Sequence, residues 1–173
     1  MINRKHTMTT LALSLGSNIN AANNIRQAVT ALQQHFGTIS CSSVYESEAV
    51  GFAGDNFLNL VVIIETNEAP PGIILTIKNL EDCQGRVRTD PKFSARTLDI
   101  DILTFGNAKG QVAGIELPRP EITENAFVLC PLAELAASAM DPVSGKTYGE
   151  LWQAYQEDQK LWRIDFDWCG VLE

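Results

Sequence analysis

Two aspartates one residue apart, preceded by several basic residues, are the part of this sequence best suited to chemistry. Residues 85–106 read GRVRTDPKFSARTLDIDILTFG, and within them Asp99 and Asp101 alternate with leucine and isoleucine. An alternation with a period of two predicts a β-strand that carries both carboxylates on one face. Neighbouring carboxylates repel each other unless a cation lies between them. Mg²⁺ suits such a pair, because it binds one or two carboxylates together with substrate phosphates.

Basic residues in a turn-rich loop lead into this strand. They are Arg86, Arg88, Lys92 and Arg96. Arginine is well suited to phosphate because its planar guanidinium group can donate two parallel hydrogen bonds. A cationic loop followed by a dicarboxylate strand is the arrangement that phosphoryl transfer needs, since that chemistry depends mostly on positioning and on neutralising charge on oxygen. Two structural alternatives remain open: a solvated acidic face, or a salt-bridge network between the aspartates and the arginines.

The composition indicates one globular domain. The chain has 173 residues, of which 45% are hydrophobic and 20% charged. We expect a flexible N-terminal extension over residues 1–10, with Met8 as an alternative start, and a single domain over residues 11–173. The net charge of −8 argues against binding to nucleic acid or to an anionic membrane surface.

The sequence also suggests a cytoplasmic protein. No apolar run is long enough to span a membrane, and residues 1–10 lack the hydrophobic segment of a secretory signal. The four cysteines are widely separated and form no CxxC motif or Cys/His ligand pattern. They are therefore expected to be idle thiols in a reducing compartment.

Hydrophobic periodicity predicts the elements that position the aspartates. A strand over residues 11–15 ends in a Gly-Ser-Asn turn, and a helix covers residues 23–36. Strands over residues 39–47 and 57–65 form a hairpin around a long loop, residues 48–56, and a second helix covers residues 69–84. With the dicarboxylate strand, this order predicts an α+β protein with a ferredoxin-like antiparallel sheet and helices on one face.

Additional C-terminal elements are expected after the dicarboxylate strand. Residues 106–114 are predicted to form a polar turn, and residues 117–124 to be irregular because they contain two prolines. A helix is expected around residues 132–139 and a short one over residues 148–155. The aromatic residues Trp162, Phe166 and Trp168 are expected to cover an edge of the core.

Three polar side chains allow both a structural and a functional interpretation. Asn59 interrupts an apolar strand, where a buried amide must find hydrogen-bond partners on a neighbouring backbone or a ligand. Glu81, one turn before the basic loop, could bind a ribose or pair with an arginine. His35 is best interpreted as a surface residue near the end of its helix.

Four ordered motifs give the sequence a family resemblance. They are LSLGSN at residues 13–18, FLNLVV at 57–62, RTLDIDIL at 96–103 and AFVLCPL at 126–132. Together they span most of the chain, which resembles the 6-hydroxymethyl-7,8-dihydropterin pyrophosphokinases of folate biosynthesis. The resemblance implies transfer of the β,γ-pyrophosphoryl unit of ATP to the hydroxymethyl group of a reduced pterin, which leaves AMP.

The resemblance also implies roles for individual residues. Asp99 and Asp101 would bind two Mg²⁺ ions, and Arg86, Lys92 and Arg96 would assist catalysis. ATP would contact Glu81, Arg88, Phe93, Ile102 and Arg119. The pterin pocket would be lined by Gly16, Ser47, Val50, Phe57, Asn59 and Phe127, with the ring between Phe127 and either Tyr45 or Phe57. The expected partners are ATP and 6-hydroxymethyl-7,8-dihydropterin, bound by a monomer.

The sequence departs from the family pattern at several positions that concern ATP. Many relatives carry histidine where Arg119 stands, arginine at Asn125, tryptophan at Phe93 and arginine at Lys92. A second hypothesis is therefore a catalytically weak or inactive paralogue that binds a pterin or a nucleotide. A third is a ferredoxin-like interaction module that binds neither.

Overall fold

The central feature of the fold is an antiparallel sheet built from segments far apart in the chain. The computed structural model describes residues 7–85 and 95–172. The sheet has the order β5-β1-β4-β3-β8, and β2 also pairs with β4. These strands are β1 (Thr9–Ser17), β2 (Ile39–Cys41), β3 (Tyr45–Ser47), β4 (Phe57–Thr66), β5 (Asp99–Phe105) and β8 (Leu161–Arg163). The predicted ferredoxin-like α+β class is confirmed.

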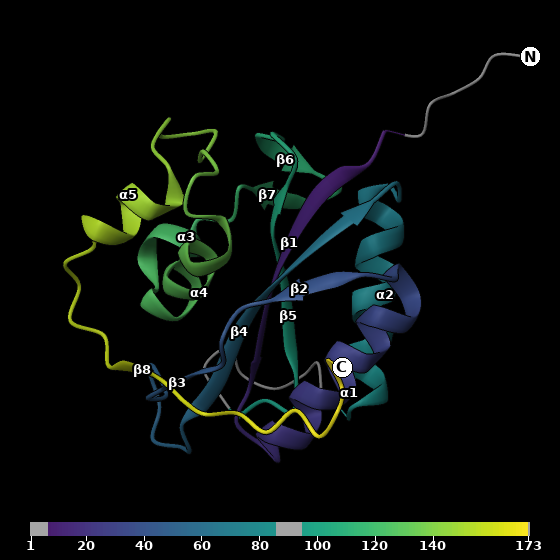
Figure 1. The fold of residues 1–173 in the computed structure, drawn as a ribbon, viewed down its shortest axis with the longest axis vertical. Coiled ribbons are helices and arrows are strands. Elements are labelled where there is room, and N and C mark those ends of the chain that lie inside the picture. Colours follow the sequence, from purple (N-terminus) through teal and green to yellow (C-terminus); the bar gives the residue numbers. More distant parts are fainter. Residues whose placement is uncertain (1–6, 86–94, 173) are drawn as a thin grey trace, which may run out of the picture.

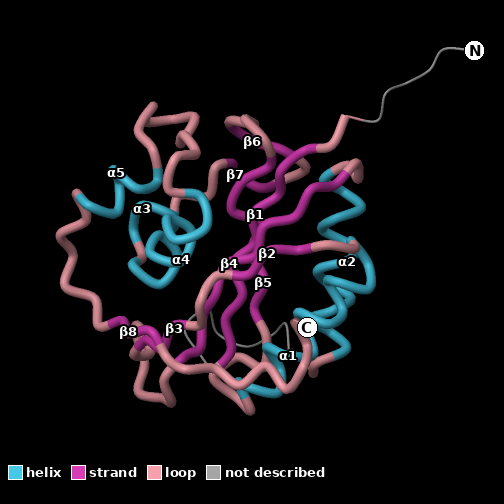
Figure 2. The backbone as a smooth tube through the Cα atoms, in the orientation of Figure 1, coloured by secondary structure: helices cyan, strands magenta, loops and turns pink. Residues whose placement is uncertain are grey.

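Helices cover both faces of the sheet, where the sequence had suggested one (Figures 1 and 2). On one face, α1 (Ala21–Phe36) and α2 (Pro70–Cys83) pack on residues such as Leu13 and Val62. On the other face, α3 (Glu121–Glu124), α4 (Ala126–Ala136) and α5 (Tyr148–Gln153) pack on Ala12, Val61 and Leu103. Both faces of the central strands are buried and largely apolar. The sequence of a strand therefore does not show whether helices cover one face of the sheet or both.

The first two helices agree with the periodicity of the sequence. The chain leaves α1 at Gly37, whose φ of 83° lies in the left-handed region that glycine tolerates and whose N–H donates to the Gln33 carbonyl. Two prolines begin α2, where a missing N–H costs no hydrogen bond.

Three predicted boundaries in the N-terminal half are wrong. The first strand begins at Thr9, so the last two residues of the extension predicted over residues 1–10 are paired with β4. The first strand does not turn at Gly16 but continues to Ser17, because Gly16 pairs with both neighbouring strands. The predicted strand over residues 39–47 is divided into β2 and β3. At the break, the Ser42 hydroxyl accepts the Val61 N–H at 3.0 Å in place of a backbone carbonyl.

Three predictions in the C-terminal half also differ from the structure. The expected polar turn contains a hairpin of β6 (Gly110–Val112) and β7 (Ile115–Leu117). Despite the prolines, α3 forms, since Pro120 precedes its first residue and proline is tolerated there. Helix α4 begins six residues before residue 132, at Ala126, and contains Pro131.

The C-terminal residues were placed correctly only in part. The short helix α5 is confirmed, but β8 was not predicted, and Trp162 is 40% exposed instead of covering the core. Phe166 and Trp168 do pack against the core. All four cysteines are free thiols, two half-buried and two exposed. Among the residues that the structure describes, no helix combines the length and apolarity needed to cross a bilayer.

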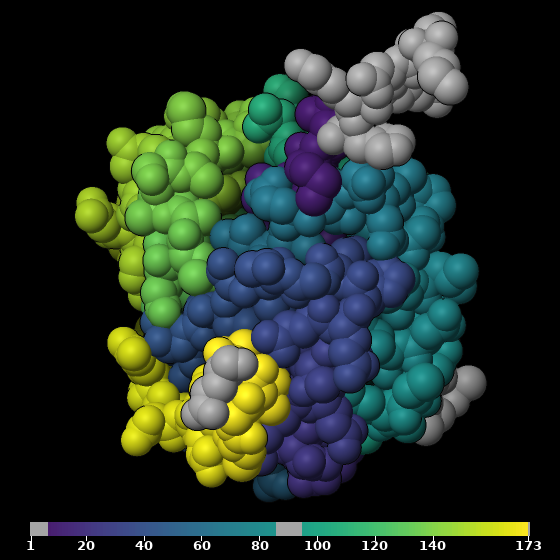
Figure 3. Space-filling model, turned by 45° about the vertical axis from the view of Figure 1, so that its right-hand side comes forward, coloured from purple at the N-terminus to yellow at the C-terminus, as the bar shows by residue number. Residues whose placement is uncertain are grey.

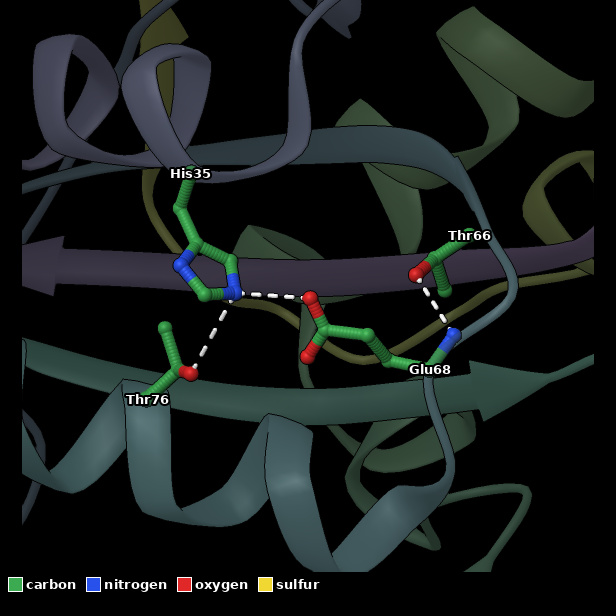
Figure 4. Close-up of polar contacts among 4 residues, drawn as sticks. All are labelled: His35, Thr66, Glu68 and Thr76. Carbon is green, nitrogen blue, oxygen red and sulfur yellow. Dashed lines mark hydrogen bonds and ion pairs between the residues drawn. The ribbon is translucent and has the colours of Figure 1, made fainter.

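His35 lies at the surface, as predicted, and connects α1 to the segment that leads into α2 (Figure 4). Its Nε2 lies 2.7 Å from Glu68 Oε1 and 3.5 Å from Thr76 Oγ1, and the Glu68 N–H donates to Thr66 Oγ1. His35 is 41% exposed at its side chain, so we expect this contact to contribute no more than about 1 kcal/mol.

Leu13, at the centre of β1, allows a test of the packing between the sheet and its helices. It is fully buried, so Leu13→Ala should lower the free energy of unfolding by about 2–5 kcal/mol through lost contacts and a cavity. Urea denaturation measures this change. The matched variant is Leu75→Ala on α2, where the leucine is 60% exposed and we expect a change within about 0.5 kcal/mol. Equal effects of the two substitutions would contradict the packing described here.

Candidate active site

A cavity of about 340 Å³ lies between the sheet and the N-terminal ends of α3 and α4. Its charged lining residues are Glu48, Arg96, Asp99, Asp101, Arg119 and Glu121. The remaining lining residues are Ser14, Gly16, Ser47, Val50, Phe52, Phe57, Asn59, Leu103, Asn125, Phe127 and Val128. A larger hollow of about 700 Å³ near the start of β1 has no charged side chain among its described lining residues, so it lacks groups for phosphoryl chemistry.

The register of the three central strands brings the two halves of this cavity together. In β1, Gly16 pairs with Asp99 of β5 on one side and with Asn59 of β4 on the other. Residues in register across antiparallel strands share a face, so Asp99 and Asn59 lie on either side of a residue without a side chain. A Cβ atom at Gly16 would lie 3.4 Å from Asn59 Oδ1 and 3.9 Å from the Phe57 ring. Glycine at this position therefore leaves space for a ligand between the two polar groups.

Asp99 and Asp101 lie on the same face of β5, as the alternation predicted, and both line the cavity. Asp101 Oδ1 forms an ion pair with Arg119 Nη2 at 3.0 Å, and Arg119 Nε lies 3.5 Å from Glu121 Oε2. Burial and the charge of Asp99 nevertheless raise the pKa of Asp101 to about 6, and Glu121 and Glu81 add to this effect. Among the described residues, the charge of Arg119 lowers this pKa but does not cancel the effect of burial and of the neighbouring carboxylates.

The segment that leads from the basic loop into β5 is held by the end of β1. The Asn18 side chain accepts the Arg96 N–H at 2.7 Å, and the Asn18 N–H donates to the Arg96 carbonyl at 3.0 Å. The Ser17 hydroxyl donates to the Thr97 carbonyl at 2.6 Å. Asn18 Nδ2 also donates to the Asp55 carbonyl, in the loop between β3 and β4. The Gly-Ser-Asn motif thus ties two loops that border the cavity to the sheet.

The predicted pterin residues surround the opposite end of the cavity. The buried amide Nδ2 of Asn59 donates to Ser47 Oγ at 2.9 Å, with longer contacts to the Tyr45 and Phe57 carbonyls. Gly16, Ser47, Val50, Phe57, Asn59 and Phe127 all line the cavity. Tyr45, the alternative to Phe57, does not; its hydroxyl donates to Glu134 Oε2 on α4 at 2.6 Å. The recess is therefore bordered by Phe57 and Phe127.

Three of the predicted ATP residues, Glu81, Ile102 and Arg119, line a smaller neighbouring cavity. This cavity of about 160 Å³ shares Asp101 and Arg119 with the cavity of about 340 Å³. Glu81 is 3% exposed, and its Oε1 accepts the Ile100 N–H at 2.9 Å. Its carboxylate therefore has a structural role, holding α2 against the beginning of β5, whether or not it also contacts a ligand. Arg86, Arg88, Lys92 and Phe93 lie outside the described residues.

Several residues that line the cavity of about 340 Å³ were not predicted from the sequence. They are Ser14, Glu48, Phe52, Leu103, Glu121 and Val128. Ser14 could have been found, because it lies two positions before Gly16 and so on the same strand face. Phe52 and Glu48 lie in the hairpin loop, and Glu121 and Val128 begin helices whose position depends on tertiary packing, so nothing local in the sequence marked them.

The described side chains suit a hard divalent cation. Asp99 and Asp101 supply carboxylate oxygens from one strand, in surroundings where Asp101 resists ionisation unless positive charge is added. Within residues 7–85 and 95–172, no group of three or more His, Cys, Asp or Glu side chains could hold a metal ion. A cation here would need further oxygen ligands, which matches the preference of Mg²⁺ for one or two carboxylates together with phosphates.

The fold and the cavity define an α+β protein that combines paired carboxylates and arginines with a recess bordered by aromatic rings. A family model for 7,8-dihydro-6-hydroxymethylpterin-pyrophosphokinase (HPPK) matches residues 12–137. The chain belongs to this family, and the resemblance found in its motifs is confirmed.

Individual relatives agree with the family model. The chain is 34% identical over 142 residues to the 2-amino-4-hydroxy-6-hydroxymethyldihydropteridine pyrophosphokinase of Synechocystis sp., a match that covers 80% of this chain and 72% of the relative. It is 32% identical over 145 residues to the protein of the same name from Aquifex aeolicus, covering 83% and 90% of the two chains.

Solved structures share the fold. The crystal structure of Plasmodium falciparum HPPK-DHPS wild type with pterin and p-hydroxybenzoate matches with a TM-score of 0.70 and 15% identity. The match covers 89% of this chain and 44% of that one, so this chain spans less than half its length. At this identity the likeness supports the fold alone.

The charge around Asp101 makes stability depend on pH when no divalent cation is present. The pKa of Asp101 is about 6 in the folded state against 3.8 for an unperturbed group, so the folded state holds the proton more tightly. The resulting destabilisation is complete above pH 6 and disappears as the pH falls below 3.8. In EDTA, Asp101→Asn should raise Tm by a few degrees at pH 8 and give no advantage near pH 3.5, as measured by thermal denaturation.

Asp165→Asn is the control for this prediction, since Asp165 is exposed in the C-terminal segment. It should change Tm by similar small amounts at both pH values. A lower Tm for Asp101→Asn than for the unmodified protein at pH 8 would contradict the prediction.

Proposed function

We propose that this protein transfers a pyrophosphoryl group from ATP to 6-hydroxymethyl-7,8-dihydropterin, giving the pterin diphosphate and AMP. The observation that carries the proposal is the placement of Asp99 and Asp101 in the same cavity as Asn59, Phe57 and Phe127. One end of that cavity has the groups that phosphoryl transfer needs, and the other can accept a flat polar ring. Family membership agrees with this activity and argues against a module that binds neither ligand.

The two ends of the cavity have different proposed roles: one binds the pterin and the other binds the phosphates of ATP. Asn59 would hydrogen-bond the polar edge of the pterin while Phe57 and Phe127 border its faces, which points the hydroxymethyl group toward β5. Its oxygen would bond to the β-phosphorus and release its proton to water, as the bond from that phosphorus to the α,β-bridging oxygen breaks and that oxygen leaves with AMP. Arg96 and Arg119 would bind phosphate oxygens through their guanidinium groups.

Asp99 and Asp101 would hold Mg²⁺, and two ions are expected. When bound, Mg²⁺ neutralises charge on phosphate oxygens and lowers the pKa of a coordinated hydroxyl group. This role fits the raised pKa of Asp101, to which the charges of Asp99 and Glu121 contribute. Glu81, Ile102, Arg88 and Phe93 are proposed to contact the nucleotide, and Arg86 and Lys92 its phosphates. The monomeric state and the cytoplasmic location remain predictions from the sequence.

A catalytically weak or inactive paralogue is the alternative, and two observations favour keeping it. Arg119 is already paired with Asp101, and Asn125 lines the cavity with an uncharged side chain where many relatives carry arginine. This hypothesis expects calorimetry to detect pterin or nucleotide binding in the absence of turnover. Production of AMP that requires both Mg²⁺ and the pterin would exclude an inactive paralogue.

The carboxylate pair provides the direct test of the activity. Asp99→Asn and Asp101→Asn should each reduce AMP formation at least about 100-fold, because each removes a charge on which transition-state neutralisation depends. Turnover is measured by chromatography of AMP with and without Mg²⁺. Asp158→Asn, an exposed aspartate between α5 and β8, is the matched control and should retain full turnover. Unchanged activity in either cavity variant would remove the metal assignment.

Asn59 tests the pterin end of the cavity separately. Asn59→Ala should raise KM for the pterin by about 10- to 100-fold, through the loss of one or two hydrogen bonds, and leave KM for ATP within about twofold. Steady-state kinetics with each substrate varied in turn gives both values. Asn107→Ala, at an exposed position after β5, should alter neither. Equal increases in both KM values would indicate a general loss of structure rather than a lost pterin contact.

A further inference from the structure

The C-terminal segment beyond the family match contacts two segments that line the candidate active site. The family model ends at residue 137, and the chain then forms α5 and a segment that we call the C-terminal strap, residues 155–164. The strap passes the beginning of α4 and enters β8, which pairs with β3 next to the cavity (Figure 1). In this ladder Leu161 pairs with Ser47, one of the residues that line the cavity.

Gln159 in the strap binds the wall of the cavity formed by the beginning of α4. Its Oε1 accepts the Ala126 N–H at 2.8 Å, and its Nε2 donates to the Glu124 carbonyl at 3.1 Å. Asn125 is the N-cap of α4 but makes no side-chain cap hydrogen bond, so the first N–H of the helix is satisfied by Gln159 instead. Gln159 thereby fixes the segment that carries Asn125 and Phe127 into the cavity.

The next residues of the strap bind the opposite wall. Lys160 Nζ lies 3.1 Å from Oε1 of Glu48, which lines the cavity. Trp162 Nε1 donates to Glu46 Oε2 at 3.2 Å, while the other oxygen of Glu46 accepts from Asn56 Nδ2 at 3.0 Å. Glu46 lies in β3 next to its last residue, and Asn56 is the last residue of the loop over residues 48–56, directly before β4. The strap therefore holds both ends of a loop that contributes Val50 and Phe52 to the cavity.

The strap is anchored on its far side as well. The Ile164 N–H donates to the Val44 carbonyl at 3.0 Å, which continues the β8 pairing. Beyond it, Arg26 of α1 donates to the Asp167 carbonyl at 2.6 Å and lies over the Phe166 ring. In the space-filling view these last residues, in yellow, lie against α1 (Figure 3). Because the strap is anchored on both sides, the consecutive residues Gln159 and Lys160 connect the beginning of α4 to the loop over residues 48–56 at a defined distance.

We propose that Gln159 is a positioning residue that sets the width of the pterin recess, by holding the Asn125–Phe127 segment at a defined distance from β3 and its loop. This proposal rests on the proposed function, since it concerns the same cavity. Gln159 is half-buried and makes hydrogen bonds to two backbone groups of this segment, one of which, the Glu124 carbonyl, also accepts the Tyr155 hydroxyl at 2.8 Å. The Lys160–Glu48 pair is 69% and 55% exposed at its side chains, so it is the weaker contact.

Gln159→Ala tests the proposal, with Gln153→Ala, an exposed glutamine at the end of α5, as the matched control. Displacing one wall of the recess should raise KM and Kd for the pterin roughly 10-fold and leave KM for ATP within about twofold. Hydrogen exchange should become faster at Ala126 and the next residues of α4, and also in residues 48–56. Lys160→Ala should affect exchange in residues 48–56 only, and Gln153→Ala should change none of these quantities.

The outcomes separate this proposal from the activity on which it rests. If the unmodified protein forms no AMP, the proposed function fails, while pterin binding and hydrogen exchange still decide the role of Gln159. If Gln159→Ala leaves both the pterin Kd and exchange in residues 48–56 at the values of the control variant, the positioning role is wrong. Equal increases in KM for pterin and ATP, with a loss of Tm, would also overturn it, since a general structural role would produce them.

Discussion

The negative charge gathered around Asp101 is the constraint on which the rest of the site depends. Asp99 and Asp101 share one face of β5, and Glu121 and Glu81 approach from two helices, while Arg119 makes the close ion pair. Such a group of carboxylates opposes its own ionisation, which is why the pKa of Asp101 is raised. Positive charge supplied from outside the chain would relieve this repulsion. The proposed binding of Mg²⁺ together with phosphates would supply such charge.

The sheet is what makes this arrangement possible. Asp99, Gly16 and Asn59 come from three strands far apart in the sequence, and the register of β1 between β4 and β5 places them in one row. Gly16 supplies the space between the acidic group and the amide, and Ser17 and Asn18 bind the segments that flank it. Motifs that look separate along the chain are thus parts of one surface, held by backbone hydrogen bonds in a core that is packed on both faces.

Asn125 and Gln159 show how residues outside the common motifs can bear on the site. Asn125 lines the cavity, and its segment is tied to Gln159, beyond the range of the family model. The loop after β3 is tied to the same strap through Lys160 and Trp162. Two walls of the cavity, the beginning of α4 and the loop after β3, are therefore held by a C-terminal segment that lies outside the family match.

The sequence alone was sufficient to predict the strand nature of residues 99–105, the shared face of its aspartates, both long helices and the α+β class. These features follow from periodicity, which depends on neighbouring residues only. It did not determine that helices cover both faces of the sheet, that Tyr45 contacts Glu134 instead of the cavity, or that Phe52, Glu121 and Val128 line the cavity. Each of these depends on how remote segments pack together. The strand β8 belongs to the same group, because it forms only where β3 offers an edge for pairing, and an edge is a property of the assembled sheet.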